Sequence, residues 1–209
     1  MSPFVESIRF LNGKHYNLAF HQARFDFTRD THYPGTKKIS LGERLVPPGG
    51  LLKDQLYKCR VIYGEEIQEV IYEPYSYRNI LQYHLVVCPH EFDYTFKLTN
   101  RSFFDEARKR LGPTEDFIYI KKGLITDTSF ANLVFTDGKE YVTPSTPLLK
   151  GTRRAYYLSE GLIREEELSV KDITRFKSFF TINAMADLEP SAANSCDKLL
   201  LSHIQLKLC

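Results

Sequence analysis

One lysine stands in a stretch of alternating residues where its amine could do chemistry. In FDYTFKL, side chains of an extended strand would alternate between two faces, so Lys97 shares a face with Asp93 and Thr95. A lysine on a strand is commonly an exposed residue that protects a sheet edge from aggregation. A buried amine with a lowered pKa can instead form an imine with an aldehyde. Periodicity alone favours the exposed interpretation, so the second needs support from other residues.

That support lies further along the chain, between Gly123 and Arg154. The segments GLITDTSFANLVF and YVTPSTPLLKGTRR carry, in order, the carboxylate of Asp127, an asparagine, a Thr-Pro pair and a Leu-x-Gly-x-x-Arg motif. Each fragment alone has an ordinary explanation, because Asp127 fits a surface acid beside a turn and Gly151 fits a loop. The ordered set, rather than any one residue, indicates a site.

Strand and helix signals alternate in the segments around these residues. YKCRVIYG and IQEVIYEPY predict a β-hairpin, and ILQYHLVV and FFTINA predict further strands. SFFDEARKRLG and LLKGTRRAYYLSEG predict helices that end at Gly112 and Gly161. The pairs Lys122-Gly123 and Asp137-Gly138 predict tight turns between later strands. This mixed order predicts an α+β fold.

Length, composition and charge indicate a folded protein with two sub-domains. The 209 residues include 43% hydrophobic and 13% aromatic side chains, which argues against disorder. We expect a sub-domain at 1–88, a connecting loop at 89–93 and a sub-domain at 94–209. The net charge of +2 does not indicate a nucleic-acid surface, and we expect Arg108-Lys109-Arg110 and Arg153-Arg154 to be solvated or helix-end residues.

Membrane, disulfide and metal signals are missing from the sequence. No apolar run is long enough to span a membrane, and MSPFVESIRF lacks the layout of a secretory signal, so we expect a cytoplasmic protein. The histidines, His203 among them, form no metal-ligand cluster, so a metal mechanism has no support. The scattered cysteines predict reduced thiols at Cys59, Cys88, Cys196 and Cys209.

The ordered set of residues resembles the class IV aminotransferases, the fold-type IV pyridoxal phosphate enzymes. The resemblance runs from VESIRF to TINAMADLEP and is densest between Gly123 and Arg154. The family includes branched-chain and D-amino-acid aminotransferases and aminodeoxychorismate lyase. It implies a two-domain fold like that of D-amino-acid aminotransferase, with a small N-terminal α/β sandwich and a C-terminal barrel-like α/β domain. It also implies a pyridoxal 5'-phosphate cofactor and a homodimer with its active site between two sub-domains.

The same resemblance implies roles for individual residues. Lys97 would form a Schiff base with the cofactor and then move the proton on the substrate carbon. Asp127 stands where the family usually has Glu, and its carboxylate would keep the pyridine nitrogen protonated so that the ring accepts electrons. The family's phosphate-binding arginine matches Arg24 in HQARF, where Phe25 replaces the usual Leu, although Arg24 also fits an ordinary amphipathic helix face. The backbone amides expected at the phosphate belong to Gly151, Thr152, Asn183 and Ala184.

The resemblance leaves the reaction open between elimination and amino transfer. Ser7 matches the place where lyase members carry a hydroxyl that assists proton transfer, but it also fits a plain strand-edge serine. The lyase interpretation predicts conversion of 4-amino-4-deoxychorismate to 4-aminobenzoate and pyruvate, for folate synthesis. Arg60 and Arg78 are candidates to bind the substrate carboxylates, because Arg pairs with a carboxylate through two parallel hydrogen bonds. Arg101 or a tyrosine is a candidate to contact the phenolic oxygen of the cofactor.

Two further functions stay open. A transaminase acting on D-amino or branched-chain amino acids would transfer the amino group to a keto acid. A non-catalytic homologue would keep the fold, and perhaps the cofactor, without turnover. Two features motivate that last interpretation: the short segment before Val5, and Asp127 at a position where the family usually has Glu. The presence of Lys97 argues against it.

Overall fold

The computed structural model describes residues 2–200 and 206–207, and the chain divides into two compact units. The first unit contains the residues up to Tyr77 together with the short segment Phe96–Asn100. The second contains Arg78–Thr95 together with the residues from Arg101 onward. The chain therefore passes from one unit to the other more than once.

The boundary between these units differs from the one expected from the sequence. The strand β5 (Gln82–Val87), expected in the first sub-domain, pairs in parallel with β6 (Glu115–Lys121) of the second unit. The expected connection at 89–93 consequently lies inside the second unit. The physical reason is that β5 finds its hydrogen-bonding partner after the connection rather than before it.

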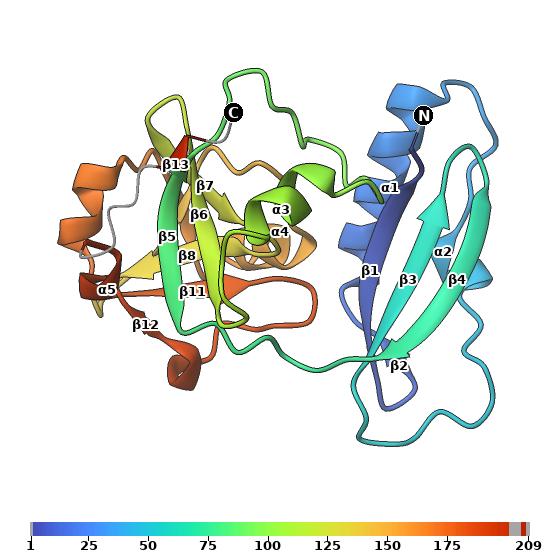
Figure 1. Cartoon of the computed structure of the whole chain (residues 1–209). Coiled ribbons are helices and arrows are strands. Elements are labelled where there is room, and N and C mark those ends of the chain that lie inside the picture. Colours follow the sequence, from blue (N-terminus) through green and yellow to red (C-terminus); the bar gives the residue numbers. More distant parts are fainter. Residues whose placement is uncertain (1, 201–205, 208–209) are drawn as a thin grey trace. The chain divides into compact units, whose positions relative to one another are not determined.

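The first unit is a four-stranded antiparallel sheet, in the order β2-β1-β3-β4, with a long helix packed on one face (Figure 1). Every second side chain of β3 is buried, as expected for a strand with one covered face. Phe25 of the helix packs in the same core as Phe4, Ile8 and Tyr63. The elements of this unit are β1 (Phe4–Leu11), β2 (Lys14–His15), α1 (Leu18–His32), α2 (Leu41–Arg44), β3 (Tyr57–Tyr63) and β4 (Ile67–Pro74).

The second unit is built on a nine-stranded mixed sheet that branches at β8. One edge of β8 pairs first with β7, at Asp127 and Asn132, and then with β9, while the other edge pairs with β11. Its remaining strands are β7 (Leu124–Thr128), β8 (Asn132–Thr136), β9 (Tyr141–Pro144), β10 (Arg164–Glu166), β11 (Ser178–Ile182), β12 (Asn194–Ser195) and β13 (Leu206–Lys207). Its helices are α3 (Ser102–Arg108), α4 (Thr152–Ser159), α5 (Asp197–Leu200) and the 3-10 helices η1 (Val170–Arg175) and η2 (Pro190–Ala192). The α+β fold class expected from the sequence is confirmed.

Most of the locally encoded elements form as predicted. The turn between β6 and β7 has positive φ angles of 52° at Lys122 and 80° at Gly123, which suit a two-residue hairpin. Gly138, with φ of 98°, lies in the turn between β8 and β9. The helix α3 begins at Ser102 as expected but ends at Arg108, before Gly112.

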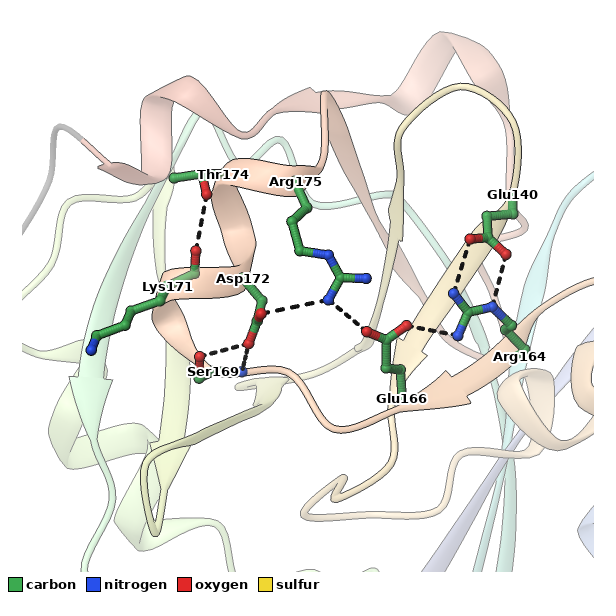
Figure 2. A network of polar contacts seen from close by, with 8 residues as sticks. All are labelled: Glu140, Arg164, Glu166, Ser169, Lys171, Asp172, Thr174 and Arg175. Atoms are coloured by element: carbon green, nitrogen blue, oxygen red, sulfur yellow. Dashed lines mark hydrogen bonds and ion pairs between the residues drawn. The ribbon is translucent and has the colours of Figure 1, made fainter.

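A network of surface ion pairs joins the turn before β9, the strand β10 and the helix η1 (Figure 2). Arg164 donates to both carboxylate oxygens of Glu140, at 2.8 and 2.9 Å, and to Glu166 at 2.7 Å. Glu166 also accepts from Arg175 at 2.6 Å. Ion pairs that are exposed to solvent contribute little to stability. The network contains none of the predicted site residues, so we assign it a structural role.

None of the helices in the described part of the chain is both long enough and apolar enough to cross a membrane. No group of three metal-binding side chains occurs among those residues. Cys59, Cys88 and Cys196 are free and buried, whereas Cys209 and His203 lie outside the described residues.

Candidate active site

Asp127 lies buried near the end of β7, with both carboxylate oxygens hydrogen-bonded. The Asn132 side-chain amide donates to Oδ1 at 2.8 Å, and the Leu149 backbone amide donates to Oδ2 at 2.9 Å. Asn132 Nδ2 also donates to the Leu149 carbonyl at 2.9 Å. These contacts fix the orientation of the carboxylate relative to the segment that leads into α4.

The environment of Asp127 strongly affects its ionisation. Burial raises the pKa of this carboxyl group to about 7. The hydrogen bonds from Leu149 and Asn132 and the charge of Arg154 lower the pKa, but they offset burial only in part. Arg154 itself forms its ion pair with Glu165. A carboxylate in this situation is stabilised in its charged form when a cation comes into contact with it.

The backbone at Gly151 approaches Asn132 so closely that a side chain cannot fit there. A Cβ atom at Gly151 would lie 2.0 Å from Asn132 Oδ1. Gly151 is also the N-cap residue of α4, whose first residue, Thr152, is buried. The structure therefore brings together Asp127, Asn132 and the start of this helix, where two of the predicted phosphate-binding amides lie. Sequence reasoning misses Asn132 as a site residue, although it is the asparagine of the ordered motif.

Arg153 and Arg154 lie in the first turn of α4, so they are helix-end residues as expected, but they are buried rather than solvated. Arg154 NH2 donates to the Pro144 carbonyl at 2.8 Å and to Glu165 Oε1 at 2.5 Å. Arg153 NH2 forms an ion pair with Asp187 Oδ1 at 3.1 Å. The acceptors lie on β9, on β10 and after β11 rather than on α4 itself, so the charge pattern of the helix gives no sign of them.

Asn183 lies directly after β11 and organises its own turn. Its side-chain oxygen accepts from the amides of Met185, at 2.8 Å, and Ala186, at 3.0 Å. Its backbone amide donates to the Ala186 carbonyl at 3.2 Å. The expectation that the Asn183 amide binds a phosphate therefore needs correction, because this donor is already used. Ala184 remains the candidate donor of the predicted pair.

Arg101 contacts the turn that follows Asp127. Its guanidinium donates to the Tyr94 hydroxyl at 3.1 Å and to the Ser129 carbonyl. The Ser129 hydroxyl in turn donates to Asp116 Oδ2 at 3.0 Å. Asp116 is fully buried, and its burial raises its pKa. Sequence reasoning does not find Asp116, because its position inside a hydrophobic strand gives no signal of its polar partner.

Lys97 belongs to the first unit, and the strand expected around it is not formed. The carboxylate of Asp93 accepts hydrogen bonds from the amide and hydroxyl of Thr95, at 2.9 and 2.6 Å, which favours a local turn over an extended strand. After this turn, the chain pairs with β1 at one isolated bridge, between Leu98 and Phe4. The Lys97 carbonyl accepts from the Val5 amide at 2.9 Å. The backbone of Lys97 is thus held by β1.

Arg24 forms a buried cluster with Glu6 of β1 and His21, one helical turn earlier on α1. Arg24 Nε donates to Glu6 Oε1 at 2.8 Å, and Arg24 NH2 donates to Oε2 at 2.6 Å. His21 Nδ1 lies 2.6 Å from Glu6 Oε2. Burial lowers the pKa of His21, and the positive charges of Arg24 and Lys97 act in the same direction, against the hydrogen bond and charge of Glu6. Lys97 therefore lies within electrostatic range of this cluster.

Ser7 and Arg60 lie on the sheet face opposite to Glu6. They are directly paired neighbours on β1 and β3, and successive residues of a strand point to opposite faces. Arg60 NH1 is 3.3 Å from Glu73 Oε1. Arg78 belongs to the second unit, where its guanidinium stacks over the Phe130 ring at 4.9 Å from the ring centre. The structure therefore brings Ser7 and Arg60 together and places the two candidate substrate-binding arginines in different units.

Comparisons with known proteins agree with this fold. Residues 66–192 match the sequence profile of the amino-transferase class IV family. An uncharacterized protein of Haemophilus influenzae is 33% identical over 189 residues, which make up 90% of this chain and 100% of that protein. The chain therefore belongs to the class IV aminotransferase family. It is a pyridoxal-phosphate-dependent enzyme of that class.

Two solved structures are similar over most of their length. A candidate 4-amino-4-deoxychorismate lyase from Haemophilus somnus 129PT has a TM-score of 0.83 and 26% identity, over 90% of this chain and 98% of that one. The 4-amino-4-deoxychorismate lyase from Pseudomonas aeruginosa has a TM-score of 0.67 and 16% identity, over 88% of this chain and 80% of that one. The second likeness is evidence for the fold alone.

Proposed function

We propose that the protein is a lyase that converts 4-amino-4-deoxychorismate to 4-aminobenzoate and pyruvate with bound pyridoxal 5'-phosphate. Support for a lyase rather than a transaminase comes from the likeness to the Haemophilus somnus protein, at 26% identity and a TM-score of 0.83. The hydroxyl of Ser7 on β1 gives further support. We also propose that the protein acts as a homodimer, as the family resemblance implies.

The observation that carries the proposed cofactor chemistry is the fixed, buried carboxylate of Asp127. Its pKa near 7 suits a partner that brings a positive charge, such as a protonated ring nitrogen. Gly151 is the N-cap residue of α4, and helix N-termini favour phosphate. Arg24 adds a cation suited to phosphate. Each unit thus supplies residues whose chemistry suits pyridoxal 5'-phosphate.

In the proposed mechanism each residue has one task. When bound, the cofactor supplies a ring that stabilises negative charge on the substrate carbon. Lys97 would hold the cofactor through Nζ. Its freed amine would take the proton from the amino-bearing substrate carbon and give it to the enolpyruvyl group as the bond between that group's oxygen and the ring breaks, so that pyruvate leaves and the ring becomes aromatic. The Ser7 hydroxyl assists that transfer. Asp127 would keep the ring nitrogen of the cofactor protonated, and Arg60 and Arg78 would bind substrate carboxylates.

The proposal is tested by supplying the purified protein with aminodeoxychorismate and, separately, with D-amino and branched-chain amino donors plus a keto acid. We expect 4-aminobenzoate and pyruvate to form in equal amounts. We expect Lys97→Ala to lower this rate at least about 100-fold, because a positioned acid–base group is lost. Amino transfer without 4-aminobenzoate would show a transaminase instead. A protein that binds the cofactor but turns over none of these substrates would favour the non-catalytic interpretation.

A further inference from the structure

Glu6 is a fully buried acid that the proposed mechanism does not use. It lies on β1 between the core residues Val5 and Ile8, on the strand face covered by α1. An isolated carboxylate in such a place is costly, because it loses its hydration. Its presence is therefore explained only by the groups that it binds.

Those groups lie one turn apart on α1. Arg24 meets the carboxylate with two hydrogen bonds, Nε to Oε1 at 2.8 Å and NH2 to Oε2 at 2.6 Å, in a fork that fixes the plane of the guanidinium. His21 Nδ1, 2.6 Å from Oε2, is the third contact. Of the Arg24 side chain, 12% stays exposed, whereas Glu6 and His21 are completely covered. The carboxylate therefore holds the guanidinium from the buried side.

The protonation states agree with this geometry. Burial tends to raise the pKa of Glu6, but the charge of Arg24 and the hydrogen bonds from His21 and Arg24 lower it to about 2. Glu6 is therefore ionised at neutral pH. His21, whose pKa is lowered chiefly by burial, is neutral, so its Nδ1–H donates to Glu6. The Arg24 guanidinium therefore carries the positive charge that an anion would bind, and it keeps an exposed part while Glu6 holds it from the buried side.

We propose that Glu6, assisted by His21, is a positioning residue that orients the Arg24 guanidinium for the phosphate group of the cofactor. This inference rests on the proposed function, because it takes Arg24 as a phosphate ligand. The preference for a phosphorylated cofactor then depends on the acid buried behind Arg24 and not on Arg24 alone. Glu6 does not contact the reacting atoms, so its effect appears in binding of the phosphate and not in the chemical step.

A role limited to holding α1 against β1 would make a different prediction. Loss of structural support would weaken binding of any ligand, with or without phosphate. Loss of guanidinium orientation would weaken binding of pyridoxal 5'-phosphate and leave binding of pyridoxal, which lacks the phosphate, largely unchanged. The ratio of the two dissociation constants therefore separates the two roles.

The experiment compares both dissociation constants in wild type, Glu6→Gln and the control Glu69→Gln, which makes the same change at an exposed position of β4. We expect Glu6→Gln to weaken the binding of pyridoxal 5'-phosphate about 10- to 100-fold, which is the loss typical of one or two charged hydrogen bonds. Pyridoxal binding should change far less, and Glu69→Gln should behave as wild type. Circular dichroism establishes that each variant is folded.

Three results would overturn the inference. If Glu6→Gln leaves the ratio of the two dissociation constants as in wild type, even if both ligands bind more weakly, Glu6 has no orienting role. The proposed function would then still stand. If wild type itself binds neither ligand, the proposed function fails and the inference fails with it. Should Glu6→Gln not fold, His21→Ala removes one contact to Glu6 and leaves the Arg24 fork intact. We expect it to weaken pyridoxal 5'-phosphate by a smaller factor, and an unchanged ratio there counts against the inference.

Discussion

At Asp127, burial and hydrogen bonding act in opposite directions on one carboxyl group. Burial is the larger effect and raises the pKa of this group to about 7, from an ordinary value of 3.8. A carboxyl group with a raised pKa in the folded state holds its proton more tightly there than in the unfolded chain. Its contribution to stability is therefore greatest below pH 3.8 and falls as the pH rises towards 7.

The substitution Asp127→Asn should reveal the loss of stability that ionisation of the buried Asp127 causes. The measurement uses protein to which no cofactor has been added. Because Asn does not titrate, the stability of the variant relative to wild type should rise with pH up to about 7 and then level off. Urea unfolding of both proteins between about pH 5 and pH 8 measures the difference. Asp54→Asn provides a matched control, because it makes the same substitution at an exposed position. If the difference in free energy of unfolding between Asp127→Asn and wild type stays constant from about pH 5 to pH 8, the raised pKa of Asp127 is wrong.

At the scale of elements, Asn132 links β7, β8 and the segment before α4. Its side chain bonds to Asp127 and Leu149, and its Oδ1 occupies the space next to Gly151. The two strands are paired at Asp127 and Asn132 themselves. The position of the acid therefore depends on the close approach of the α4 start to this asparagine.

Gly151→Ala should disturb that arrangement, because the new Cβ would lie 2.0 Å from Asn132 Oδ1. We expect a loss of about 1–3 kcal/mol in the free energy of unfolding, as for other overpacked sites, and weaker cofactor binding. Gly49→Ala is the control, since a Cβ there meets no atom within 4 Å. Denaturant unfolding measures both variants. Equal stability of the two variants would show that Asn132 adjusts freely and does not fix Asp127.

Elements encoded by nearby residues were predictable from the sequence, and those that depend on distant partners were not. The Lys122-Gly123 turn forms as expected, because its positive φ angles are a local preference. The strand at Lys97 does not form, because Asp93 bonds to Thr95 and the following segment pairs with β1, far away in the sequence. Sequence periodicity reports only on a residue's near neighbours, so it cannot predict pairing with a strand that is distant in the sequence.

At the scale of the whole molecule, the chain forms two units from interleaved segments. The short segment Phe96–Asn100 belongs to the first unit although the residues on both sides of it belong to the second. A boundary estimated from composition cannot show this, because it assumes that each unit is continuous in sequence. The sequence also gives no sign that Glu6 and Arg24 share one buried cluster, because that contact joins a strand to a helix and depends on how the two pack.

Covalent trapping shows whether Lys97 carries the cofactor. The protein is incubated with pyridoxal 5'-phosphate, reduced with borohydride, digested and analysed by peptide mass spectrometry. We predict a phosphopyridoxyl group on Lys97 as the main product and its loss in Lys97→Ala. Modification spread over surface lysines, or concentrated at a lysine other than Lys97, would contradict the account.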